Sequence, residues 1–145
     1  MLNAYMLRSV LPGLLLFAFA VSLPAEEVSR EDALAIHAVI AEQLDAFAKD
    51  DAPRAFSLAT AGIRARFGTP EVFMDMVRTA YAVVYRPKTV QFEKPEIVDG
   101  ELIQPVKMTD AEGHAWIALY PVQRQSDGAW RINGCQIARL PGRET

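Results

Sequence analysis

Two tyrosines and an arginine form the cluster of this sequence that is best suited to ligand chemistry. Tyr81 and Tyr85 are four residues apart, so a helix would bring both phenols to one face, and Arg86 follows directly. Two phenols beside a guanidinium can hold an anion, and a buried tyrosine can stabilise an oxyanion while a carboxylate moves a proton. The aspartates that could supply that carboxylate all have helix-surface or capping explanations: Asp45, Asp50, Asp51 and Asp75. We therefore assign no catalytic residue.

A glutamine on an apolar stripe is the second candidate. Gln43 lies among Ile40, Leu44 and Phe47 at helical spacing, where a polar amide must find hydrogen-bond partners. It either contacts a ligand or bonds a nearby backbone group. Large aromatic residues at alternating strand positions, such as Trp116, are core residues first and cavity walls if a cavity is open. The candidate ligand-binding residues are Gln43, Phe47, Tyr81, Tyr85, Arg86 and Trp116.

Several kinds of site are disfavoured by spacing. His37 and His114 have no neighbours at metal-ligand intervals, and zinc needs three or four ligands in a compact set. Ser57 and Ser126 lack a strand-to-helix elbow, and no glycine-rich loop precedes a Lys-Ser or Lys-Thr pair. Cys135 is the single cysteine, and its neighbours carry no charge that would lower its pKa. We expect a buried, inert thiol and neither a metal nor a cofactor.

The apolar pattern changes from helical to strand period at Pro87, which predicts an α+β fold with segregated elements. Helices are predicted at 29–49, 51–59 and 69–86. Strands are predicted at 89–93, 102–108, 114–122 and 130–138, with an extension of the first to Val98 left open beyond Pro95. Short turn sequences join the strands, so three N-terminal helices should pack on a four-stranded antiparallel meander.

The last predicted strand contains a change of phase. Trp130 and Ile132 lie on one face of the strand, whereas simple alternation would put Cys135 and Ile137 on the other face. An extra residue near Gly134 would return all four side chains to one face, because a β-bulge opposes two residues to one and bends the strand. A bent sheet is concave, so helices lying against it would form a cone whose open end is a natural pocket.

The strand at 114–122 is apolar on both faces, which leaves one face for a partner. Ala115, Ile117 and Leu119 alternate with the aromatic positions of the other face. A homodimer through the outer face of the sheet would cover them, and so would a buried strand centre within one chain. Both explanations remain open at this stage.

The first 25 residues have the layout of a secretory signal. Arg8 precedes an uncharged run that is too short to span a bilayer and is interrupted by Pro12. Cleavage after Ala25 is preferred to cleavage after Ala20, and an uncleaved anchor is the alternative. Residues 26–145 should then form one periplasmic or secreted domain without a stable membrane anchor. Its 14 basic and 18 acidic residues give a net charge of −4, and without a basic stripe nucleic acid is not an expected partner.

Several pieces of the mature chain resemble a family of exported bacterial proteins, domain of unknown function 4864. They are Asp50-Asp51 with Ala55-Phe56, Phe67-Gly68, 73–77, 81–87 and 130–135. The element order is also similar to the cystatin-like, nuclear-transport-factor-two type of fold, whose conical cavity is catalytic, ligand-binding or filled. The resemblance implies export and fold and leaves the activity open.

Three functions remain compatible with these patterns. The leading hypothesis is a non-catalytic module that binds a small apolar or weakly anionic molecule, or a protein partner, in or around the cone. The alternatives are a small cofactor-free isomerase, dehydratase or hydrolase that uses a tyrosine with a carboxylate, and a structural envelope protein that acts through its sheet face. Whether the cone is open, and what lies beside its phenols, would separate them.

Overall fold

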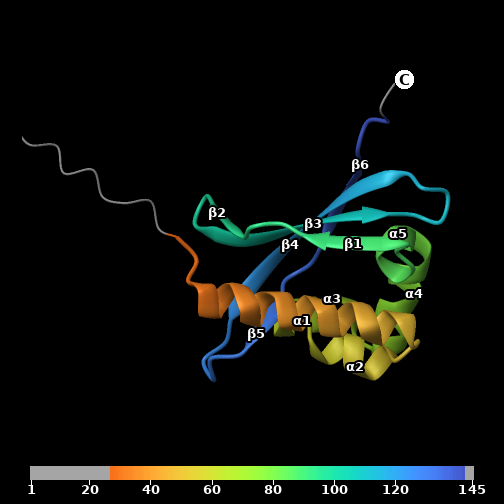
Figure 1. The fold of residues 1–145 in the computed structure, drawn as a ribbon. Helices are drawn as coiled ribbons and strands as arrows, with labels where there is room; N and C mark the ends of the chain where they lie inside the picture. Colours follow the sequence, from red (N-terminus) through yellow and green to blue (C-terminus); the bar gives the residue numbers. More distant parts are fainter. Residues whose placement is uncertain (1–26, 143–145) are drawn as a thin grey trace, which may run out of the picture.

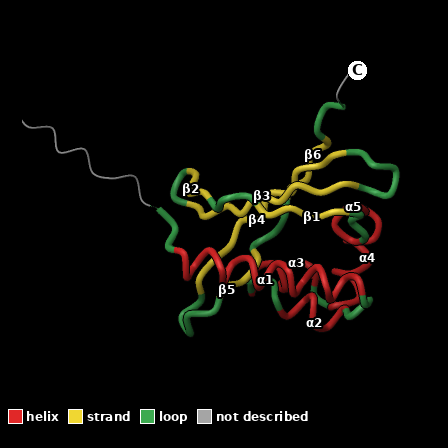
Figure 2. Tube along the Cα trace, viewed as in Figure 1, coloured by secondary structure: helices red, strands yellow, loops and turns green. Residues whose placement is uncertain are grey.

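The computed structural model describes residues 27–142, and within them a helical layer lies against one face of a curved antiparallel sheet (Figures 1 and 2). The predicted leader and its cleavage sites lie outside these residues. The helices are α1 (Arg30–Ala48), α2 (Ala52–Ser57), α3 (Ala61–Phe67), α4 (Pro70–Ala80) and α5 (Ala82–Tyr85). The strands are β1 (Thr89–Phe92), β2 (Glu96–Val98), β3 (Glu101–Thr109), β4 (Ala115–Arg124), β5 (Trp130–Ile132) and β6 (Gln136–Arg139). The α+β class is therefore confirmed.

The first residue of each predicted helix, Ser29, Asp51 or Thr69, is an N-cap in the structure. Ser29 Oγ accepts a hydrogen bond from the backbone N–H of Asp32 at 3.1 Å, and Asp51 Oδ1 accepts one from Arg54 at 3.2 Å. Thr69 Oγ1 caps α4 in the same way. Each cap satisfies a backbone N–H that the first helical turn leaves without a partner, so these polar residues fix where α1, α2 and α4 begin.

The prediction of three helices was wrong in two places. Residues 61–67 form a separate helix, α3, because the Thr60 side chain caps it and Gly68, with a φ of 80°, ends it. Gly62 lies inside this helix. The third predicted helix also breaks at Tyr81, whose φ of −129° and ψ of 49° are not helical, so α5 is a separate turn.

The sheet has β3 and β4 at its centre. Its strand order is β1–β3–β4–β5, with β2 also paired to β3 and β6 also paired to β4, and these pairs are all antiparallel. The four predicted strand regions are thus present, but the first and last are each split in two. Pro95 lies in the gap between β1 and β2, as expected for a residue that cannot donate to a ladder.

The predicted change of phase near Gly134 is confirmed by the strand register. Ile132 lies opposite Val122, and Gln136 lies opposite Leu119, so four steps along the last strand correspond to three along β4. One extra residue therefore sits between β5 and β6, which is a β-bulge. Gly134 adopts a φ of 108°, a backbone conformation that favours glycine. The bulge brings Ile137 opposite Ala118, on the same face as Ile132.

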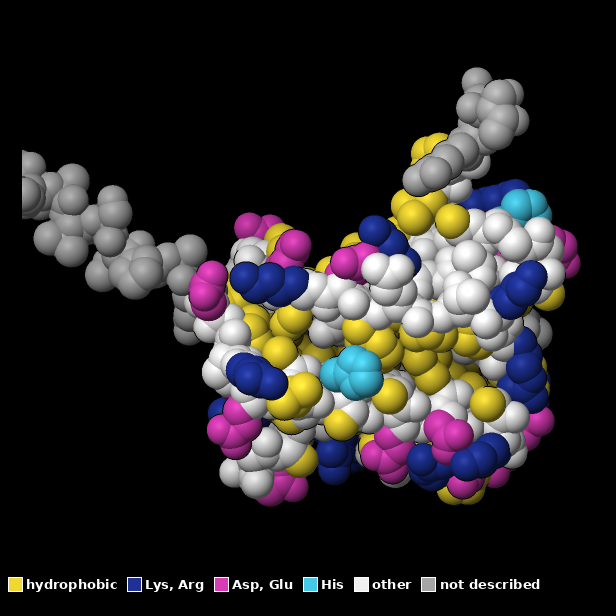
Figure 3. All heavy atoms as spheres, viewed as in Figure 1, with side chains coloured by type: hydrophobic (Ala, Val, Ile, Leu, Met, Phe, Trp, Pro, Cys, Tyr) yellow, Lys and Arg dark blue, Asp and Glu magenta, His cyan; other side chains and the backbone are white. Residues whose placement is uncertain are grey.

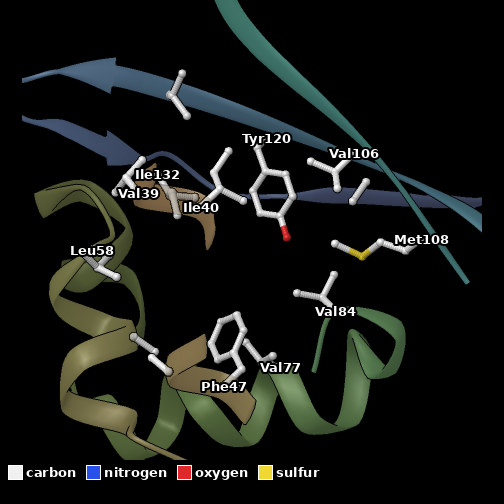
Figure 4. Close-up of a cluster of buried hydrophobic side chains, with 14 of the residues drawn as sticks. Val39, Ile40, Phe47, Leu58, Val77, Val84, Val106, Met108, Tyr120 and Ile132 are labelled. Atoms are coloured by element: carbon white, nitrogen blue, oxygen red, sulfur yellow. The ribbon is translucent and has the colours of Figure 1, made fainter. Parts of the chain in front are cut away.

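The core lies between the helices and the concave face of the sheet (Figure 4). The even-numbered residues of β4 from Ala118 to Val122 are buried there. The helices contribute Ile36, Ile40, Phe47, Met74, Val77 and Val84, each with at most 4% of its surface exposed. Burial of such side chains contributes about 1.5–3 kcal/mol each, so this cluster is the main source of stability.

The helices leave apolar surface uncovered in two places. On the outer face of the sheet Leu119 is 37% exposed and Ile117 is half-buried. Hydrophobic side chains are also visible between α1 and the strands nearest to it in Figure 3. Exposed apolar residues on these elements include Leu34 of α1 and Val90 of β1. Within residues 27–142, no helix has the length and apolar character required to cross a membrane.

Candidate functional site

A pocket of about 290 Å³ opens between α1, α3, α4 and the β-bulge. Most of its surface is apolar, and three of the predicted residues, Gln43, Phe47 and Tyr81, border it. The full lining is Gln43, Phe47, Ala59, Ile63, Arg66, Phe67, Phe73, Met76, Val77, Tyr81, Val84, Tyr120, Ile132, Gly134 and Cys135. Five of these side chains are labelled in Figure 4. An apolar cavity with a few polar groups is the general form of a small-molecule site.

Gln43 has a structural partner. Its Nε2 donates a hydrogen bond to the backbone oxygen of Ala55 at 3.0 Å, and the residue is only 3% exposed. This bond joins α1 to α2 and satisfies a buried donor. The side-chain oxygen of Gln43 takes no part in that bond, and the residue borders the pocket. Gln43 therefore combines a structural role with a position on the pocket wall.

Tyr81 joins the helical layer to the bulge. Its hydroxyl donates to the backbone oxygen of Cys135 at 3.0 Å, which gives a polar group of the interrupted strand a partner. The bond spans 54 positions of sequence and ends on one side of the pocket. The Tyr81 proton is therefore already in use.

Tyr85 and Arg86 do not border the pocket. The break at Tyr81 separates the two tyrosines, and Tyr85 instead donates to Asp50 Oδ1 at the surface. Arg86 Nη2 and Arg78 Nη2 lie 3.2 and 3.1 Å from the same carboxylate, and Arg86 Nη1 donates to the backbone oxygen of Phe47. The anion that we expected these residues to hold is therefore supplied by the protein itself, as Asp50.

The Asp50 cluster is electrostatically unsuited to general base catalysis. The hydrogen bond from Tyr85, followed by that from Arg78, lowers the pKa of the Asp50 carboxyl. The Asp50 side chain is also 47% exposed, so it is not the desolvated carboxylate that a tyrosine–carboxylate pair requires. Its contacts instead tie the end of α1 to α4 and α5.

Trp116 also lies away from the pocket. Its Nε1 donates to Asp110 Oδ2 at 2.9 Å, and this bond is the main reason why the pKa of Asp110 falls to about 2. Asp110 further accepts from the backbone N–H groups of Glu112 and His114. Ligand atoms of Asp110, Glu112 and His114 lie within 4.8 Å of one another. We did not expect this grouping, and the bonds of the β3–β4 turn account for it.

Tyr120 occupies one of the alternating aromatic positions of β4, for which we expected a place in the core or on a cavity wall, and it borders the pocket. It is 1% exposed, and its hydroxyl has no hydrogen-bond partner among the residues described. Burial, with a smaller contribution from Cys135, raises the pKa of the phenol well above its ordinary value. Cys135 is half-buried and not fully buried as we expected, but desolvation of its thiol raises its pKa to about 12, so the cysteine is a thiol at neutral pH and a poor nucleophile. The alternation of inward and outward side chains along β4 predicts that Tyr120 points toward the core, but it does not predict that its hydroxyl lacks a hydrogen-bond partner.

Comparison with known proteins supports the fold and gives the family. No curated protein matches the chain. The solved structure of Aln2 from a Streptomyces species is similar, with a TM-score of 0.50 and 20% identity over 79% of this chain and 94% of that one. This likeness agrees with the cone-shaped cystatin-like arrangement of helices on a curved sheet. The family described as "Domain of unknown function (DUF4864)" matches residues 29–145, and the chain is a member of that family.

Proposed function

We propose that this chain is an exported, non-catalytic module that binds a small apolar or weakly anionic molecule in the pocket between α1, α3, α4 and the bulge. The single observation that carries the proposal is the pocket itself, with a volume of about 290 Å³ and largely apolar walls. That volume is close to the lower end of the range for small-molecule sites. Gln43 and Tyr81, two of the six candidate residues, provide polar groups on its wall.

The charge of the lining favours a neutral or weakly anionic molecule. Arg66 borders the pocket from the exposed side of α3, and no ion pair to it is found among the residues described. Its guanidinium lies 5.8 Å from the centre of the Phe67 ring. An anionic group at the mouth would meet this cation while the apolar part of the molecule lay inside.

Binding is better supported than catalysis by the groups at hand. No carboxylate occurs among the lining residues, and Cys135 is held as a thiol by its raised pKa. The phenol–carboxylate contact of Tyr85 and Asp50 is exposed and lies elsewhere. A proton-transfer enzyme would need a poised acid or base within reach of the ligand.

Native mass spectrometry of the protein purified from its own envelope tests the proposal. We expect a retained small molecule, and we expect Met76→Trp to lose it because the larger side chain would fill the pocket. Val72→Trp is the matched control, since Val72 is 51% exposed on the same helix and outside the pocket. Retention of the same mass by folded Met76→Trp would refute the pocket as the site.

A homodimer through the outer face of the sheet is a second candidate, favoured by one observation. Leu119 is 37% exposed at the centre of that face, beside half-buried Ile117, Pro105 and Pro121. Sedimentation of Leu119→Asp against the unchanged protein tests it. Association lost only in the variant would support the dimer, and a monomeric unchanged protein would refute it.

A further inference from the structure

We propose that Tyr120 is the recognition residue of this pocket, and that its ligand carries a neutral hydrogen-bond acceptor, such as a carbonyl or ether oxygen, at the end that enters first. This inference rests on the proposed function, because it names the chemistry of the ligand that the pocket would hold. The inferred contact is a hydrogen bond from the Tyr120 hydroxyl to that oxygen.

The first argument is the unsatisfied hydroxyl. Tyr120 projects from the concave face of β4, and in Figure 4 its oxygen points toward the helices, in the direction of Val84 and Met108. Buried polar groups almost always have hydrogen-bond partners, and this one has none among the described residues. A phenylalanine would fill the same space without that penalty. The missing partner is what a ligand would supply.

The second argument separates the two phenols of the pocket. The Tyr81 hydroxyl donates to the Cys135 backbone oxygen at 3.0 Å, so its proton is committed to the fold. The Tyr120 hydroxyl lies on the opposite, sheet side of the same pocket and has no hydrogen bond of ordinary geometry among the described residues. The polar group beside it is the Cys135 thiol, a weak acceptor that a carbonyl or ether oxygen of a ligand would replace. Because burial keeps this phenol protonated at neutral pH, it acts toward a ligand as a donor.

The third argument concerns the charge of the group that Tyr120 can meet. The neighbouring lining residues Phe47, Val77, Val84 and Ile132 are apolar, and the basic residue of the lining, Arg66, lies at the exposed side of the site. A carboxylate next to Tyr120 would be buried without a counter-charge, which is strongly unfavourable. A neutral acceptor needs only the one hydrogen bond.

The volume limits the size of the ligand. About 290 Å³ corresponds to roughly ten water molecules at ~30 Å³ each, so a compound of about ten non-hydrogen atoms would fit. The Tyr120 hydroxyl is itself shielded from solvent, so an occupant must displace a lining side chain to reach it. Cys135 lines the pocket and its thiol acts on the phenol, so we infer that this side chain is the one displaced.

Two probes of equal shape test the inference. Acetophenone and α-methylstyrene differ in that a carbonyl oxygen replaces a methylene group, so both can fill the pocket but only the ketone can accept from Tyr120. Affinities for the unchanged protein and for Tyr120→Phe are measured by titration calorimetry. We expect the ketone-to-hydrocarbon affinity ratio to fall about fivefold in Tyr120→Phe, which corresponds to one hydrogen bond. The affinity for α-methylstyrene should stay the same.

The control removes a hydroxyl outside the pocket. Thr79→Val alters an exposed residue of α4 whose hydroxyl bonds its own helix, and it should leave both affinities unchanged. Equal affinity ratios in the unchanged protein and Tyr120→Phe, with both probes bound, would refute the role of Tyr120 and leave the pocket function standing. Binding of neither probe to the unchanged protein would overturn the small-molecule proposal and this inference with it.

Discussion

The same substitution at two tyrosines of one pocket should change the stability of the protein in opposite directions. Tyr120→Phe removes a buried hydroxyl that has no partner among the described residues, and Tyr81→Phe removes one that donates at 3.0 Å to the Cys135 backbone oxygen. Both changes delete a single oxygen atom and keep the ring. Differences in packing are therefore small compared with the difference in hydrogen bonding.

The expected magnitudes follow from the cost of a buried, unpaired polar group. That cost is about 1–3 kcal/mol, so we expect Tyr120→Phe to raise the free energy of unfolding by about 1 kcal/mol. Tyr81→Phe should lower it by about 1–2 kcal/mol, because the bond is lost and the Cys135 carbonyl loses a donor. For a domain of this size, 1 kcal/mol corresponds to a shift of roughly 4 °C in Tm.

Urea unfolding of ligand-free protein, followed by circular dichroism, measures both values. The slope of the free energy against urea should be the same in all three proteins, so that midpoints report stability and not a change in the unfolded state. Destabilisation of Tyr120→Phe by about 1 kcal/mol or more would show that the hydroxyl has a structural partner. That result would also remove the main argument for Tyr120 as a ligand-binding residue.

Three further outcomes can be checked independently. Trp116→Phe should raise the pKa of Asp110 from about 2 toward 3.8, measured by carboxyl NMR titration. The lowered pKa contributes stability that is complete above the unfolded-state value and is lost as the pH falls toward the folded-state value, so the variant should lose less stability than the unchanged protein between about pH 4 and pH 2. Gly134→Ala should destabilise the fold by about 1–2 kcal/mol, because the backbone φ of 108° is strained for any residue with a side chain. Gly62→Ala in α3 has open space around it and should be neutral or stabilising by up to about 1 kcal/mol. Thermal unfolding of the two variants compares these effects. If the predicted leader is cleaved, the intact mass of the protein expressed with its full sequence in a bacterial host should correspond to cleavage after Ala25, and the full-length mass would refute cleavage.

Local patterns were sufficient to predict the fold class and the bulge. Caps at Ser29, Asp51 and Thr69 define helix starts through bonds that reach only three residues, so they can be found from the sequence. The parity change between Ile132 and Ile137 likewise depends only on strand period. Such features need no knowledge of distant contacts.

The missed helix α3 had local signals, its cap at Thr60 and its end at Gly68, but the other errors arose where a distant contact decides the local structure. The apolar spacing continues through Tyr81, so the sequence showed no reason for a helix break, yet the Tyr81 phenol bonds a carbonyl 54 positions away. The pairing of Tyr85 with Asp50 and of Trp116 with Asp110 was equally hidden, because each depends on how elements pack. In the structure three of the six candidate residues, Tyr85, Arg86 and Trp116, therefore lie outside the pocket.

One hydrogen bond, from the Tyr81 hydroxyl to the Cys135 backbone oxygen, joins the helix break to the bulge and helps to shape the pocket. An uninterrupted last strand would pair the Cys135 backbone with β4, whereas the extra residue frees its carbonyl to accept from Tyr81. The same irregularity places Gly134 and Cys135 along the pocket, close to the buried Tyr120 hydroxyl. A ligand that displaces the Cys135 side chain would therefore act on the segment that joins the sheet to α4. Binding at Tyr120 should be coupled to the Tyr81 contact, and a double-mutant cycle of the two phenylalanine variants, with acetophenone affinity as the readout, would measure that coupling.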